Sequence, residues 1–224
     1  MSGDGKAAIL GNIRRALGRG EVQGEAREAC EARLKTHPRN LIPARSKLPH
    51  AEQVALFVRM AEAVKATVAR VAKDEDVPEA VVQYLKGQNL PSDVVMAPDP
   101  ALDRYGWAGQ KMLAIRRGKP ADADQVSVTG ALCGIAETGT LMMASGPEHP
   151  TTLNFMPETH VVVLRADQMV GAYEEGFDLL RARGSTLPRT VNLITGPSRT
   201  GDIEQKIELG AHGPRRLHIV IVGD

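Results

Sequence analysis

The chain ends in the sequence E-L-G-A-H-G-P-R-R-L-H-I-V-I-V, residues 208–222, where glycine and proline lead into a largely apolar run. A short run of this kind, without regular polar alternation, is typical of a strand covered on both faces, as in a parallel sheet between helices. Comparable runs predict strands at residues 94–97, 112–115, 126–128, 140–144, 161–164, 191–194 and 217–222. The sequence therefore favours an α/β fold with a mainly parallel sheet.

Three helices are predicted around these strands. Apolar residues at alternating steps of three and four predict a long amphipathic helix over residues 51–72. A second helix, residues 78–86, has proline in its first turn and ends at Gly87. A third, residues 167–182, links two strands, and we expect it to bury Val170, Tyr173, Phe177 and Leu180. The strand–helix–strand order implies a right-handed crossover.

The first fifty residues differ from the rest of the chain. Helical patterns at residues 6–17 and 25–35 are followed by a proline-rich, irregular connection over residues 36–49. This segment has little apolar surface to bury, so we do not expect it to fold alone. We predict an N-terminal helical arm over residues 1–50 and an α/β domain over residues 51–224.

Composition excludes several classes of protein. The net charge of the 224 residues is +1, and three Phe, three Tyr and one Trp offer no base-stacking surface, so we expect no nucleic-acid partner. No apolar run is long enough to span a bilayer, and the N-terminus lacks a signal core, which predicts a cytoplasmic protein. Cys30 and Cys133 form no C-x-x-C pair, so we expect free thiols and no zinc or iron–sulfur site.

Candidate ligand-binding residues follow several of the apolar runs, where an open α/β sheet places its site at the carboxyl ends of its strands. Glu137 lies in I-A-E-T-G-T-L, residues 135–141, with apolar flanks, and Gly139 allows close backbone approach. Glu137 could meet a ligand as nucleophile, base or acceptor. It could equally be a structural carboxylate that accepts backbone N–H groups at a turn.

A second candidate is N-L-I-T-G-P-S-R-T-G-D-I-E-Q, residues 192–205. A strand, a glycine-containing turn and a helix N-terminus would together form an anion cradle. Ser198 and Thr200 offer hydroxyls, and Arg199 offers a planar fork for carboxylate or phosphate. The alternative is ordinary capping, since Asp202 and Glu204 fall in the first turn of the expected helix.

His212, on the connection into the last strand, is a weaker candidate for a proton carrier or donor. No metal-binding pattern is visible, because Glu148, His149, Glu158 and His160 do not form H-E-x-x-H or a comparable spacing. We therefore predict no metal site.

The segments at residues 135–141, 192–205 and 208–222 together resemble the LUD-domain family, also called the lactate utilization protein C family. The resemblance covers nearly the whole chain. It implies a fold like the NagB/ribose-phosphate isomerase/CoA-transferase superfamily, a three-layer α/β/α sandwich. The family is associated with a three-component bacterial system that oxidises L-lactate to pyruvate, whose other two components are cysteine-rich iron–sulfur proteins.

The resemblance implies that this chain is the non-iron–sulfur subunit, which binds a small anionic ligand or its partner subunits and carries no cofactor itself. Iron–sulfur clusters are then expected on the two partners. Some CoA-transferases of the superfamily use a glutamate as acyl nucleophile, and Glu137-Thr138-Gly139 is similar to their motif. The alternative is thus an autonomous CoA-transferase-like or sugar-phosphate isomerase-like enzyme using Glu137. The candidate ligand-binding residues are Thr138, Gly139, Gly196, Ser198, Arg199, Thr200 and His212.

Overall fold

The computed structural model describes residues 3–184, 186–200, 208–210 and 212–223. The chain divides into two compact units, Met1–Leu41 and Ile42–Asp224. The first unit holds α1 (Gly3–Ala16) and α2 (Gly24–Thr36), which confirm the two helices predicted there. Past α2, His37 adopts a left-handed conformation that ends the helix, and its N–H donates to the carbonyl of Arg33 at 3.0 Å.

The second unit is built on a six-stranded sheet in which every pairing is parallel. Its order across the sheet is β1 (Thr67–Val71), β12 (Arg216–Val222), β7 (Thr159–Arg165), β4 (Val126–Gly130), β2 (Asp93–Met96) and β3 (Ala114–Arg117). The mainly parallel sheet predicted from the apolar runs is therefore confirmed.

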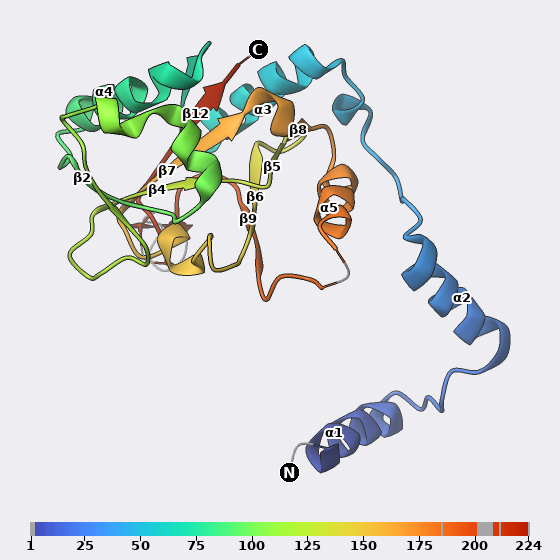
Figure 1. Ribbon diagram of the computed structural model, residues 1–224. Coiled ribbons are helices and arrows are strands. Elements are labelled where there is room, and N and C mark those ends of the chain that lie inside the picture. The colour runs from blue at the N-terminus through green and yellow to red at the C-terminus, as the bar shows by residue number, and fades with distance from the viewer. Residues whose placement is uncertain (1–2, 185, 201–207, 211, 224) are drawn as a thin grey trace. The chain divides into compact units, whose positions relative to one another are not determined.

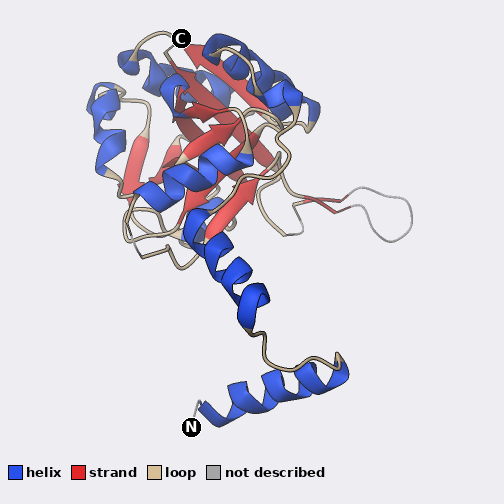
Figure 2. Cartoon of the chain, turned by 90° about the vertical axis from the view of Figure 1, so that its right-hand side faces the viewer, coloured by secondary structure: helices blue, strands red, loops and turns tan. Residues whose placement is uncertain are grey.

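Two apolar cores lie on opposite faces of this sheet, because alternate residues of a strand point to opposite sides. Val161 and Val163 of β7 join the core that includes α4 (Val77–Gly87), whereas Val162 and Leu164 join the core that includes α3 (His50–Ala63). Figures 1 and 2 show the sheet between these helices. The arrangement confirms the α/β sandwich, and α4 matches the helix predicted at residues 78–86.

A second, four-stranded sheet lies on the α3 side, in the order β8 (Met169–Val170), β5 (Cys133–Ile135), β6 (Thr140–Ala144) and β9 (Val191–Ile194). β6 is antiparallel to both β5 and β9, so the strands predicted at residues 140–144 and 191–194 exist but belong to this smaller sheet. Helix α5 (Tyr173–Ala182) packs on it. A Cβ on Gly176 would lie 3.0 Å from the Met142 side chain and 3.3 Å from that of Cys133.

The helix predicted over residues 51–72 is wrong in its second half. Helix α3 ends at Ala63, and Thr67–Val71 forms the edge strand β1, which pairs with β12. The ending is a Schellman motif. Lys65 adopts a φ of 73°, its N–H donates to the carbonyl of Glu62, and the N–H of Ala66 donates to that of Ala61. Because lysine takes the position usual for glycine, the sequence gives no stop signal.

The helix predicted over residues 167–182 is wrong in its first six residues. Met169–Val170 pairs with β5 as β8, and α5 begins only at Tyr173. Gly171 separates them, and a Cβ there would lie 2.1 Å from the carbonyl oxygen of Ser46. Phe177, expected to be buried, is 36% exposed.

The remaining elements are short. Arg199–Thr200 (β10) and Glu208–Leu209 (β11) pair as antiparallel strands. The 3-10 helices are η1 (Ala44–Ser46), η2 (Asp74–Asp76), η3 (Pro100–Tyr105), η4 (Trp107–Gly109), η5 (Thr151–Asn154) and η6 (Ala166–Gln168). Within the part of the chain that the structure describes, no helix has the length and apolarity needed to cross a membrane.

Candidate functional site

One cavity of about 300 Å³ lies between the loop that follows β9 and the start of β12, and we call it the loop pocket. Its lining includes Phe155, His160, Leu193, Gly196, Ser198, Arg199, His212 and Pro214. Four of the predicted ligand-binding residues, Gly196, Ser198, Arg199 and His212, thus come together in one cavity.

Ser198 ties the two loops of this pocket to each other. Its N–H donates to the carbonyl of Pro214 at 2.8 Å, and its own carbonyl accepts from Gly210 at 3.1 Å. Its hydroxyl oxygen also accepts from the N–H of His212 at 3.4 Å. Gly196 has a φ of 75°, and a Cβ there would lie 2.6 Å from the carbonyl oxygen of Val64. Glycine is therefore required both by the backbone angle and by the close approach of α3.

A buried histidine forms part of the wall. His160 is completely buried, and its Nε2 is 2.8 Å from the hydroxyl oxygen of Thr129. Its Nδ1 has no hydrogen-bond partner among the described residues. Burial disfavours the charged ring and lowers the pKa of His160 to about 3. The loop pocket thus contains a neutral imidazole beside the exposed, cationic Arg199.

We expected the candidate ligand-binding residues at the carboxyl ends of the strands, but the loop pocket lies at the opposite end of the six-stranded sheet. His160 and Leu217 lie near the starts of β7 and β12, so this cavity is at the amino ends of those strands. The segment 208–222 leads into β12, and a loop that precedes a parallel strand lies at its amino end. The backbone of Thr200 lies in β10, and the helix expected after it falls on residues 201–207, with Asp202 and Glu204, outside the described residues.

Glu137 lines neither the loop pocket nor the second pocket described below. It is 5% exposed, and its carboxylate accepts a hydrogen bond from the N–H of Tyr173 at 3.3 Å. Its own N–H donates to the carbonyl of Gly171 at 3.1 Å. These contacts are those of a carboxylate at the N-terminus of α5, where the helix dipole favours negative charge.

The residues after Glu137 connect to the loop pocket through hydroxyl groups. The Thr140 hydroxyl is 2.7 Å from those of Thr138 and Thr195, and Thr138 donates to the Tyr173 hydroxyl at 3.0 Å. Thr195 directly precedes Gly196 in the chain. Gly139 has a φ of 66°, and a Cβ there would lie 2.3 Å from the backbone nitrogen of Ala61. The turn therefore packs closely on α3, near the loop pocket but outside its lining.

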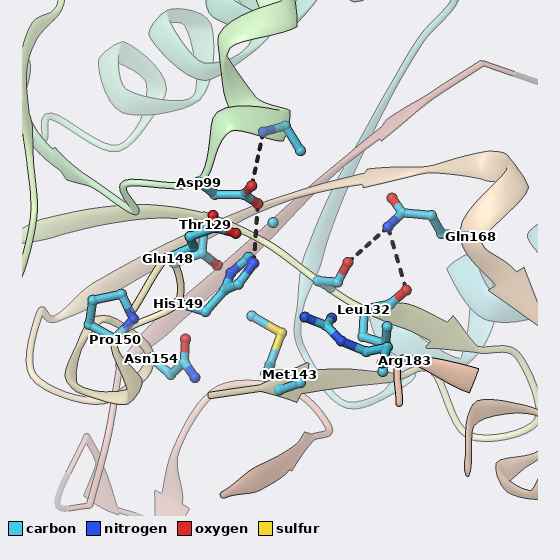
Figure 3. Close-up of a pocket in the computed structure, with 14 residues that line it drawn as sticks. Asp99, Thr129, Leu132, Met143, Glu148, His149, Pro150, Asn154, Gln168 and Arg183 are labelled. Atoms are coloured by element: carbon cyan, nitrogen blue, oxygen red, sulfur yellow. Dashed lines mark hydrogen bonds and ion pairs between the residues drawn. The ribbon is translucent and has the colours of Figure 1, made fainter. Parts of the chain in front are cut away.

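A second cavity, of about 270 Å³, lies at the carboxyl ends of β2 and β4, and we call it the strand-end pocket (Figure 3). Its lining includes Asp99, Thr129, Met143, Glu148, His149, Asn154, Gln168 and Arg183. Asn154 also lines the loop pocket, and Thr129 is the partner of His160. This cavity occupies the position expected for a ligand site in an open α/β sheet.

Asp99 and His149 form an ion pair across this pocket when the imidazole is protonated, with 3.3 Å between Oδ2 and Nε2. The other carboxylate oxygen of Asp99 accepts the N–H of Ala101 at 2.9 Å and caps η3. Gln168 donates to the carbonyl of Ala131 at 2.8 Å, which fixes the loop after β4. Sequence patterns missed this group because Asp99 and His149 are far apart along the chain. The sequence does hint at Asp99, because this acid follows the strand predicted at residues 94–97 by two residues.

Comparisons with known proteins place this architecture in a family. Lactate utilization protein C of Bacillus subtilis is 26% identical over 150 residues, which cover 58% of this chain and 62% of that protein. An uncharacterized protein of Escherichia coli, YkgG, is 25% identical over 99% of both chains. The crystal structure of a DUF162 family protein from Deinococcus radiodurans superposes with a TM-score of 0.60 at 26% identity, covering 79% of this chain and 99% of that one.

Most of the other curated relatives are matched over only part of their length. The chain spans 40% to 62% of them, with E. coli YkgG as an exception. The model of the LUD domain family matches residues 102–222, which include β4 to β12 and most of the lining of both pockets. The chain therefore belongs to the LUD domain family.

Proposed function

We propose that this chain takes part in lactate utilization as a subunit that binds a small carboxylate anion in the loop pocket. The observation that carries the proposal is the convergence of Ser198, Arg199 and His212 on one cavity. Support for lactate as the physiological context comes from relatives named lactate utilization protein C.

The groups around the loop pocket suit a 2-hydroxy or 2-oxo acid. A guanidinium fork pairs with a carboxylate through two parallel N–H donors. The hydroxyl of Ser198 can exchange a hydrogen bond with a hydroxyl or carbonyl group, and the neutral, completely buried ring of His160 adds no charge to the wall. Leu193 and Phe155 supply apolar wall for a short carbon chain. The binding energy then comes mainly from Arg199, and the selectivity from the neutral groups.

We further propose that electron transfer takes place on two cysteine-rich iron–sulfur partner subunits. Lactate oxidation releases two electrons, and clusters held by cysteine thiolates are suited to accept them. In this chain, Cys30 is exposed on α2 and Cys133 is buried in β5, in different units. An autonomous enzyme centred on Glu137 receives no support from the contacts of that residue, which face the start of α5.

Isothermal titration of the purified chain with L-lactate and pyruvate tests the binding step. Replacement of Arg199 by alanine should weaken carboxylate binding by about 1.5–3 kcal/mol, the range for a hydrogen bond to a charged group. Arg59→Ala is the matched control, because Arg59 is an exposed residue of α3 that lines neither pocket. Equal affinity in the wild type and Arg199→Ala would remove the basis of the proposal.

A genetic test addresses the physiological context. Deletion of the gene should impair growth on lactate but not on pyruvate, and a copy carrying Arg59→Ala should restore growth where Arg199→Ala does not. Copurification from the native organism should recover the two cysteine-rich proteins. Normal growth on lactate in a strain without another lactate dehydrogenase would contradict the proposed role.

A further inference from the structure

We propose that the strand-end pocket is a binding site for a divalent transition-metal ion held by Asp99, Glu148 and His149. The structure brings one possible ligand atom from each of these side chains within 4.8 Å of the others. Figure 3 shows the Asp99 carboxylate joined by a dashed line to the His149 ring, with Glu148 drawn next to that ring. The proposal departs from the sequence-based prediction of no metal site, which tested only local spacings, and the proposed function does not use this group.

Two acids, Asp99 and Glu148, and one arginine, Arg183, line the strand-end pocket. Asp99 is only 8% exposed, and a carboxylate removed from water is costly unless a positive charge or hydrogen bonds compensate it. A second carboxylate, that of Glu148, lies beside it. Among the described residues, no lysine or arginine nitrogen lies within 4.0 Å of either carboxylate, and His149 is the sole ion-pair partner of Asp99. A bound ion would neutralise both acids.

A third oxygen donor lines the same cavity. Asn154 is 7% exposed, and its amide nitrogen makes a long contact of 3.4 Å to the side-chain oxygen of Asn192. Asn154 lines the strand-end pocket, and Figure 3 shows its side-chain oxygen on the side of His149. An amide oxygen at this place in the cavity could serve as a further ligand, directly or through a bound water.

The donor set indicates the class of ion. One imidazole nitrogen with carboxylate oxygens suits zinc, manganese or iron, whereas magnesium and calcium prefer oxygen alone. Donors bound to such an ion at about 2.0–2.2 Å lie about 3–3.5 Å apart. The 3.3 Å between Asp99 and His149 already has this value. Glu148 is exposed, so it can rotate to complete the site.

Two features separate this group from an ordinary cluster of surface acids. The site lies in a cavity at the carboxyl ends of β2 and β4, and Asp99 is held there by its bond from the Ala101 N–H. The ligand His149 lies in the loop after β6, close to the second ligand Glu148 in sequence, so both come from one short segment. The ion would therefore link the β2 end of the sheet to the loop after β6.

Manganese titration of the full chain, with free Mn²⁺ measured by electron paramagnetic resonance, tests the site. The wild type should bind one equivalent, and Zn²⁺ should displace it because zinc binds such donors more tightly. Asp99→Asn and His149→Ala should each weaken Mn²⁺ binding about tenfold or more, since losses of even outer-sphere partners cost about 10–100-fold. Glu148→Gln changes an exposed residue and should weaken binding without affecting the fold.

His50→Ala is the matched control, because His50 is exposed at the start of α3 and lines neither pocket. It should leave Mn²⁺ affinity at the wild-type value. Thermal melting of each variant identifies any that fail to fold, and Glu148→Gln keeps the test decisive if Asp99→Asn is unstable. Absence of a stoichiometric Mn²⁺ site, or equal affinity in Glu148→Gln, His149→Ala and the wild type, would overturn the proposal.

Discussion

The carboxylate of Glu137 accepts a hydrogen bond from the backbone N–H of Tyr173, the first residue of α5, at 3.3 Å. A second carboxylate, that of Glu175, accepts the N–H groups of Gly171 and Ala172 at 2.6 and 3.3 Å. The first N–H groups of a helix have no partner within the helix, so these two acids satisfy donors at its start. Glu137 thereby joins the turn after β5 to α5.

Glu137→Gln should lower the free energy of unfolding by about 1–3 kcal/mol, because a buried, charge-assisted hydrogen bond is replaced by a neutral one. Urea unfolding measures this free energy. Glu174→Gln, in the first turn of α5, is the control and should lower the free energy of unfolding by less. A catalytic Glu137 would give the opposite pattern, with unchanged stability and lost growth on lactate. An active but destabilised variant would leave only the structural role.

Gly139→Ala should destabilise the protein by about 2–5 kcal/mol. The left-handed backbone costs alanine about 1–2 kcal/mol, and overpacking against Ala61 adds about 1–3 kcal/mol. Gly146→Ala is the control, because Gly146 has no atom within 4 Å of the added methyl group and no positive φ. Denaturant unfolding of both variants gives the comparison. Equal stability would show that the turn can move away from α3.

Stability should fall as the pH is lowered from about 6.5 towards 4. Burial lowers the pKa of His160 to about 3 and that of His218 to about 4, so both stay neutral in the fold. In the unfolded chain these two histidines take up protons near pH 6.5, whereas in the folded chain they do not. The free energy of unfolding is therefore at its full value above about pH 6.5 and decreases as the pH falls below it. Each histidine contributes up to about 1.4 kcal/mol per pH unit. In urea unfolding at pH 7, 6 and 5, His218→Gln should reduce this dependence and His50→Gln should not.

The two cysteines should differ sharply in reactivity. Cys30 is exposed, whereas burial raises the pKa of the Cys133 thiol to about 11, so little thiolate forms near neutral pH. A thiol reagent at pH 8 should modify one cysteine in the native chain and both in urea. The variant Cys30→Ser should then react only after unfolding. Rapid modification of native Cys30→Ser would show that β5 is accessible from solvent.

The sequence predicts elements well where local signals agree with the tertiary structure. Helix α4 carries proline in its first turn and an apolar stripe, and β12 is a largely apolar run, so both appear as predicted. The helix predicted over residues 51–72 is too long because Val64, Val68 and Val71 continue the helical spacing beyond the end of α3. Pairing of Val68 and Val71 with β12 decides their structure, and this long-range contact leaves no mark in the helical pattern.

The two pockets also differ in whether local sequence signals reveal their residues. Ser198, Arg199 and His212 fall in two glycine- and proline-containing loops that the sequence marks directly, and these residues do come together. Asp99 and His149 meet only because β2 and the loop after β6 are brought together by the packing of two sheets. A local motif search cannot find a pair separated in this way. The division of the predicted strands between two sheets was missed for the same reason.

The end of α3 has a consequence for how the chain can vary in length. Gly139 packs against Ala61 and Gly196 against Val64, so two loops distant in sequence rest on the same helical turn. Insertions in surface loops are usually tolerated. An added residue just before Val64 would instead rotate the helix end by about 100° relative to the preceding turns. It would displace Val64, which supports Gly196, relative to Ala61, which supports Gly139. The segment from Ala61 to Val64 is therefore a stretch of fixed length, and natural or designed insertions should be found on either side of it.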